Sequence, residues 1–156
     1  MKTIELTQGK VAIVDDADFE FLSRFNWFAQ KRRWTETWEP VTYLREGGKR
    51  FPRGMAAILI NPPPGKLVDH RNRNPLDNQR HNLRLATNSQ NMANRATWGN
   101  KFGRGVFVNK DNRFTVRVQV CGKRRSVGTF KTPEEAAQAY NEAAKQLHGE
   151  FAVINE

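Results

Sequence analysis

The chain of 156 residues has a single cysteine, Cys121, and no long apolar run. One cysteine excludes a disulfide scaffold and a cysteine-rich structural zinc site. No apolar stretch is long enough to span a membrane, and no hydrophobic region follows the basic N-terminus as it would in a signal peptide. The sequence therefore predicts a protein of a reducing, cytoplasmic compartment with no membrane partner.

Acidic residues are scarce relative to basic ones, since 26 Lys and Arg face 16 Asp and Glu for a net charge of +10. The excess is uneven: residues 101–132 hold nine basic residues and one acid, whereas residues 133–156 hold one Lys and five Glu. This segregation indicates a polyanion partner, above all nucleic acid, although a merely soluble basic protein remains the alternative from charge alone.

Apolar residues make up 38% of the chain, which allows one ordinary domain or two small ones. The first part mixes strand patterns with one short helix that begins at Asp16 as its expected N-cap. A Pro-Pro-Pro-Gly run at 62–65 ends this part. The expected elements are a strand at 10–16, a helix at 16–25, strands at 26–29 and 38–44, a turn at 46–49 and an apolar run at 55–60.

The middle part predicts two short strands and a helix. A strand over 66–70 precedes a polar loop over 71–79, and Leu83 and Leu85 indicate a second strand. A helix over 88–95 follows, capped by Thr87 or Asn88.

Residues 96–102 are expected to form a linker, and residues 103–156 to form three strands and one helix. The valines at 116, 118 and 120 alternate with polar residues, which indicates a strand with one apolar face. Thr132 is the expected N-cap of the helix, with Pro133 following it, and Gly149 the residue that ends it. The apolar stripe of this helix is expected at Ala136, Ala139, Tyr140, Ala143 and Leu147.

Asp69 and His70 form an adjacent carboxylate–imidazole pair within the polar stretch 68–95. Hydrolysis of a phosphodiester needs an activated water and a nearby positive charge that stabilises the negative charge on the phosphate. The usual pKa of histidine, about 6.5, suits His70 as the general base. Asp69 is suited to anchor a hard cation such as Mg²⁺, and Asn91 to supply a second oxygen ligand.

The spacing Asp69-His70, Asn82, Asn91 resembles the HNH endonucleases of phage homing type, in which two short strands and a helix surround one metal. The resemblance implies that Asp69 and Asn91 are metal ligands, His70 is the general base, and Asn82 is structural, tying the loop and orienting His70. It also implies that Arg84 and Arg95 contact phosphate. The cofactor would be one divalent cation, Mg²⁺ or alternatively Mn²⁺, in a bacterial or phage-infected cell.

The region upstream of the motif is also similar to this family, with one departure. Family members usually carry Met-His-Arg shortly before the motif, where this chain has Met55-Ala56-Ala57. Any help that the missing His or Arg gives to catalysis or DNA contact would be absent here.

Residues 103–156 resemble the Apetala-type (ethylene-response-factor) DNA-binding domain, through Arg104-Gly105-Val106, Gly128-Thr129-Phe130 and the run at 136–144. The resemblance implies a three-stranded sheet that enters the major groove. Phe107, Asn109, Asp111 and Ser126 depart from plant members at contact positions, so base reading and simple phosphate binding both stay open. The residues expected to face DNA are Arg104, Arg113, Arg117, Gln119 and Arg124.

The sequence thus predicts an α+β protein: a nuclease domain over 1–95 with a ββα-metal core at 67–95, then an antiparallel sheet packed on one helix. The predicted function is a metal-dependent, site-specific endonuclease on double-stranded DNA. A double-strand cut would require a homodimer or two sequential events. The alternatives are a non-catalytic DNA-binding regulator with a degenerate centre and an RNA- or structure-directed nuclease, the latter disfavoured by few stacking aromatics.

Overall fold

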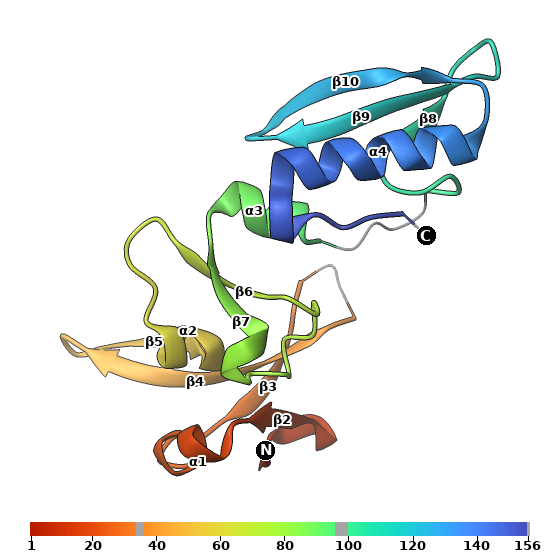
Figure 1. Cartoon of the computed structure of the whole chain (residues 1–156). Coiled ribbons are helices and arrows are strands. Elements are labelled where there is room, and N and C mark those ends of the chain that lie inside the picture. The colour runs from red at the N-terminus through yellow and green to blue at the C-terminus, as the bar shows by residue number, and fades with distance from the viewer. Residues whose placement is uncertain (34–35, 96–99, 156) are drawn as a thin grey trace. The chain divides into compact units, whose positions relative to one another are not determined.

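The structure, a computed structural model, describes residues 1–33, 36–95 and 100–155. The chain forms two compact units, Met1–Ala86 and Thr87–Glu156, each a mixed α/β arrangement with small antiparallel sheets (Figure 1). This division falls within the nuclease domain predicted over 1–95, so the last helix of the predicted motif belongs to the second unit. The predicted linker over 96–102 lies largely outside the described residues.

The N-terminal unit contains three sheets, ordered β1-β2, β3-β4-β5 and β6-β7. Its elements are β1 (Lys2–Glu5), β2 (Val11–Val14), α1 (Asp16–Leu22), β3 (Phe28–Lys31), β4 (Trp38–Glu46), β5 (Lys49–Gly54), α2 (Met55–Ile60), β6 (Leu67–His70) and β7 (Leu83–Ala86). The expected strands and the turn at Gly47-Gly48 are present. Strands β1 and β5 and the helical form of 55–60 were not predicted.

The core of this unit joins the first sheet to α1 and α2. The side chains of Val14, Leu22 and Met55 are almost fully buried there. Alternation in β2 sends Ala12 and Val14 inward, and helical spacing in α1 does the same for Leu22. Apolar burial of this kind contributes roughly 1.5–3 kcal/mol per large side chain. This core supports the neighbouring β6–β7 hairpin.

Helix α1 differs from its prediction at its first residue. The structural N-cap is Asp15 rather than Asp16, and the Asp15 side chain makes no capping hydrogen bond. Its carboxylate instead accepts the main-chain N–H of Arg80 at 2.7 Å and the Gln79 side chain at 3.3 Å. The residue at the N-cap position therefore holds the motif loop instead of capping the helix.

The C-terminal unit contains α3 (Asn88–Ala93), β8 (Val106–Val108), β9 (Phe114–Val120), β10 (Lys123–Phe130) and α4 (Pro133–His148). The three strands form an antiparallel sheet in the order β10-β9-β8, and α4 lies along one face of it (Figure 1). The predicted three strands and one helix are confirmed. Thr132 and Glu135 form a capping box at the start of α4.

The face of α4 that packs on the sheet is narrower than predicted. Ala136, Tyr140 and Ala144 are buried in a row of i, i+4 spacing, against Val116 and Val118. Leu147 lies off this row and is 37% exposed, so its predicted place in the apolar stripe is wrong. None of the helices in the described part of the chain is both long and apolar enough to cross a membrane.

Candidate active site and nucleic-acid interface

Strands β6 and β7 place the adjacent Asp69 and His70 at the end of a short antiparallel hairpin. The register pairs Asp69 with Arg84 and His70 with Leu83. Asp69 and His70 are only 5% and 8% exposed, so neither is the exposed polar residue that an isolated Asp-His pair usually is. Burial of two ionisable groups costs free energy that only specific partners can offset.

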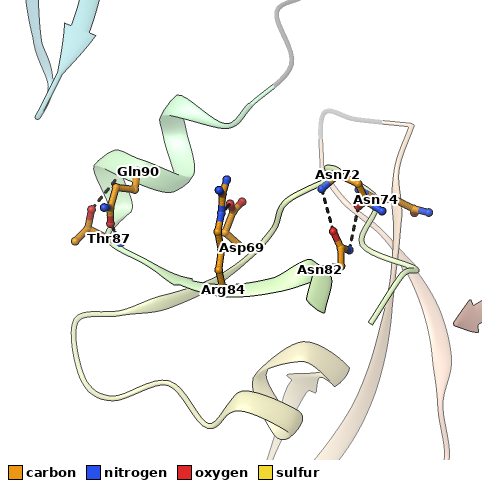
Figure 2. Close-up of polar contacts among 7 residues, drawn as sticks. All are labelled: Asp69, Asn72, Asn74, Asn82, Arg84, Thr87 and Gln90. Atoms are coloured by element: carbon orange, nitrogen blue, oxygen red, sulfur yellow. Dashed lines mark hydrogen bonds and ion pairs between the residues drawn. The ribbon is translucent and has the colours of Figure 1, made fainter. Parts of the chain in front are cut away.

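Arg84 is the partner of Asp69. Its Nε donates to Asp69 Oδ2 at 2.8 Å, and both side chains are 6% exposed (Figure 2). The predicted contact of Arg84 with phosphate stays a prediction, and the guanidinium lies in the interior against Asp69. The cause is the strand register, which sets the two residues directly opposite each other. Arg84 thus fixes one oxygen of the Asp69 carboxylate.

Asn82 holds the long loop between the two strands through hydrogen bonds of its side chain. Its Oδ1 accepts the main-chain N–H of Asn72 at 3.0 Å, and its Nδ2 donates to Asn72 Oδ1 at 3.0 Å (Figure 2). The same Nδ2 donates to the Asp77 carbonyl at 2.8 Å. The Asn82 main-chain carbonyl accepts from the Arg71 N–H at 2.9 Å. Because Asn82 is 3% exposed, these bonds lie largely out of water, where they hold the loop most firmly.

The side chain that contacts His70 is Asn78, which sequence reasoning did not assign. Asn78 Oδ1 lies 3.4 Å from His70 Nε2, a long contact, and Asn78 is completely buried. Asn78 Nδ2 donates to the Pro75 carbonyl at 3.0 Å, which fixes the amide with its oxygen toward the imidazole. The Leu-Asp-Asn run at 76–78, within the polar stretch of the motif, was the signal available in the sequence.

Burial sets the protonation state of His70. It lowers the pKa of His70 below its usual 6.5, and this effect outweighs the contact with Asn78 and the charge of Asp69, which act in the opposite direction. His70 is therefore neutral at neutral pH. The Asn78 Oδ1 beside Nε2 is a hydrogen-bond acceptor, so it fits an imidazole that carries a hydrogen on Nε2.

The N-terminal sheet and α1 hold the far end of the same loop. The main chain of Ile13 donates to the Leu76 carbonyl and accepts from the Asn78 N–H, both at 2.8 Å. Asp18 receives two hydrogen bonds from the Arg80 guanidinium, at 2.7 and 2.8 Å. The upstream region therefore acts as a scaffold that holds the loop from Asn74 to Arg80 on β2 and α1.

Asn91, the second metal ligand expected from the resemblance, lies on α3 in the C-terminal unit and is half-buried. Thr87 caps this helix by accepting from the Gln90 N–H at 3.2 Å, while Gln90 Oε1 accepts from the Thr87 N–H at 2.8 Å (Figure 2). The predicted cap is confirmed. Within residues 1–33, 36–95 and 100–155, no three His, Cys, Asp or Glu side chains gather as a metal site.

The outer face of the β8–β10 sheet carries most of the residues predicted to face DNA. Arg117 and Gln119 on β9 alternate with the buried valines, and Arg124 on β10 pairs in register with Gln119. All three are exposed, as is Arg113 at the start of β9. Arg95, just after α3, is also exposed. The sheet thus presents guanidinium groups to solvent.

Arg104 differs from this group. Its Nη2 donates to the Met92 carbonyl at 3.0 Å, and its Nη1 donates to the Arg95 carbonyl. The expected DNA contact of Arg104 stays a prediction: its side chain is half-buried, and its guanidinium is bound to main-chain carbonyls at the end of α3. Its attraction to the C-terminal end of a helix is the physical reason.

Comparisons with known proteins agree with the motif. The family model described as HNH endonuclease matches residues 61–93, which include Asp69, His70, Asn82 and Asn91. An uncharacterised HNH endonuclease of Acanthamoeba polyphaga mimivirus is 33% identical over 150 residues, covering 95% of this chain and 76% of the relative. This similarity extends through both compact units.

Proposed function

The chain belongs to the HNH endonuclease family, and on that premise we propose that it is a metal-dependent, site-specific endonuclease of homing type acting on double-stranded DNA. The observation that carries the proposal is the buried His70 beside Asp69, held in one orientation by Asn78. A neutral, oriented imidazole next to a buried carboxylate is the arrangement that water activation near a cation requires.

His70 is the general base of the proposed reaction. The neutral imidazole takes a proton from the attacking water, while Asn78 orients the ring through its contact with Nε2. The lowered pKa keeps the base unprotonated at neutral pH. General-base assistance of this kind contributes roughly 10²–10⁴-fold in rate.

Asp69 and Asn91 would hold one divalent cation, either Mg²⁺ or Mn²⁺. A buried carboxylate with one oxygen fixed by Arg84 suits a hard cation, which prefers oxygen ligands and retains several waters. When bound, the cation supplies positive charge for the phosphate and the leaving 3′ oxygen. A sparse oxygen site discriminates poorly between these two metals.

In this proposal, the outer face of the β8–β10 sheet binds the DNA. Arg113, Arg117, Gln119 and Arg124 are exposed there, and residues 101–132 hold nine basic residues against one acid. Strands fit the major groove, and Arg and Gln can read base edges there. Phosphate neutralisation by such a face predicts affinity that falls steeply with salt.

The alternative is a non-catalytic DNA-binding regulator, and one observation favours it. Met55-Ala56-Ala57 stands where the family usually has Met-His-Arg, and both alanines are half-buried in α2. The site would then lack a group that other members use.

A plasmid-nicking assay separates the two functions. Wild type incubated with supercoiled DNA should nick it with Mg²⁺ or Mn²⁺ and not with a chelator, and His70→Ala should lose nicking by at least about a hundredfold. No nicking by wild type under any metal condition would support the regulator. Equal nicking by both proteins would remove His70 from its role as base.

A further inference from the structure

Helix α3 is too short to be stable by itself. It spans Asn88–Ala93, and isolated helices below about 12–15 residues are marginal in water even for favourable sequences. Its capping box satisfies the N-terminal end, but the last carbonyls of a helix have no partner within it. What holds α3 therefore lies elsewhere in the C-terminal unit.

Arg104 binds the C-terminal end of α3. Its guanidinium donates to the carbonyls of Met92 and Arg95, which lie in and just after the last turn. Two donors in a planar fork suit two neighbouring carbonyls, and the positive charge suits this end of the helix. A lysine could reach these carbonyls only as a single point charge.

The main chain of Arg104 is itself held by hydrogen bonds to Asn155, elsewhere in the C-terminal unit. Its N–H donates to Asn155 Oδ1 at 2.6 Å, and its carbonyl accepts from Asn155 Nδ2 at 3.1 Å. The next residue, Gly105, has φ of 72°, and a Cβ there would lie 2.4 Å from both the Tyr140 ring and the Arg117 carbonyl. Arg104 is thus anchored directly beside the packed interior between α4 and the sheet.

A second contact holds the N-terminal end of α3. The Cys121 N–H, in the turn between β9 and β10, donates to Ser89 Oγ at 3.0 Å. Asn91 lies on the helix between these two attachments. Both ends of α3, the helix that carries the proposed ligand, are therefore hydrogen-bonded to residues in or beside the β8–β10 sheet.

We propose that Arg104 is a positioning residue for the metal site, which acts by fixing α3 and thereby the amide of Asn91. This inference rests on the proposed function, because Asn91 is a ligand only in that account. Arg104 does not contact DNA or metal in this role.

Direct binding of Mn²⁺ to the full chain tests the proposal. The loss of the free Mn²⁺ signal in electron paramagnetic resonance gives the Kd for wild type and variants, with and without a mixed-sequence duplex at low salt. Arg104→Ala should weaken Mn²⁺ binding about tenfold, as changes in groups that orient ligands do. Arg104→Lys should recover part of the loss, because one carbonyl still finds a cation.

The matched control is Arg117→Ala, an exposed arginine on the outer face of the sheet. It should weaken duplex binding and leave the Kd for Mn²⁺ unchanged. Arg104→Ala should show the converse pattern. Equal behaviour of the two variants in both measurements would overturn the proposal.

Two further variants guard against simple misfolding of Arg104→Ala. Ser89→Ala removes one hydroxyl from the other attachment and should weaken Mn²⁺ binding by a few-fold. In an Asn91→Ala background, Arg104→Ala should weaken it no further, because both changes act through one ligand. Additive losses would overturn the proposal, as would a wild type that binds no Mn²⁺. A wild type whose Mn²⁺ binding weakens in Arg104→Ala as expected, yet which never nicks DNA, would support the positioning role and remove the nuclease function.

Discussion

The N-terminal unit buries its functional polar side chains, whereas the sheet of the C-terminal unit leaves them in solvent. Asp69, His70 and Asn82 are 8% exposed or less, and each has partners within the loop or the opposite strand. Arg117 and Arg124 stand exposed on the outer face of the sheet. Burial costs free energy but fixes geometry, as chemistry needs. Exposure leaves side chains hydrated and ready to exchange water for phosphate.

This contrast predicts very different responses to the loss of one arginine. Arg84→Met should lower the free energy of unfolding by about 3 kcal/mol, because it leaves the buried carboxylate of Asp69 without its ion-pair partner. Arg117→Ala should change it by less than about 0.5 kcal/mol. Urea denaturation of both variants measures the difference. Similar small changes in both would show that burial of the Asp69–Arg84 pair has no stabilising role.

The loop provides a second comparison of the same kind. Asn82→Ala removes three hydrogen bonds from a buried side chain and should cost about 2 kcal/mol. Asn26→Ala, at an exposed position, is the control and should have almost no effect. Thermal denaturation compares the two. An Asn82 variant as stable as its control would contradict the account of the loop.

Low pH provides a third test, because the motif in the N-terminal unit is also held by a carboxylate, that of Asp15. The Arg80 N–H lowers the pKa of Asp15 below its usual 3.8. The stability that this carboxylate adds is full above that value and is lost as the pH falls through the lower folded pKa. Wild type should therefore lose more stability than Asp15→Asn as the pH falls from 5 to about 3. Parallel urea midpoints across this range would refute the linkage.

The smallest effect is expected in the C-terminal unit, at the turn between β9 and β10. Cys121 and Gly122 form a two-residue turn with φ of 49° and 77°. Such a turn favours Asn at its first position, so Cys121→Asn should stabilise the protein by about 0.5–1 kcal/mol. Its N–H to Ser89 is retained. Calorimetry measures the change in stability, and a Cys121→Asn protein less stable than wild type would contradict this turn conformation.

Local patterns in the sequence predicted most of the elements. The capping residues Thr87 and Thr132, the alternating valines of β9 and the turn at Gly47-Gly48 are all local signals, and the structure confirms them. Local signals are readable because they depend on neighbours along the chain. Strand β5 was missed because its Pro52 and charged residues do not alternate as a strand with one buried face does.

Contacts between distant residues could not be read in this way. The positions of Asp69, His70 and Asn82 in the motif were predicted, but the pairing of Arg84 with Asp69 depends on strand register. The contact of Asn78 with His70 depends on the way the loop is fastened to Ile13. Both Arg84 and Arg104 carry a charge that suggests DNA contact, and their tertiary partners are visible only in the structure.

The most direct test separates DNA cleavage from DNA binding in one set of proteins. The nicking rate at saturating DNA and the Kd for duplex are measured for wild type, His70→Ala and Arg124→Ala. The account predicts that His70→Ala loses at least about a hundredfold in rate with an unchanged Kd, while Arg124→Ala binds more weakly and keeps its saturated rate. A His70→Ala protein that nicks at the wild-type rate would contradict it.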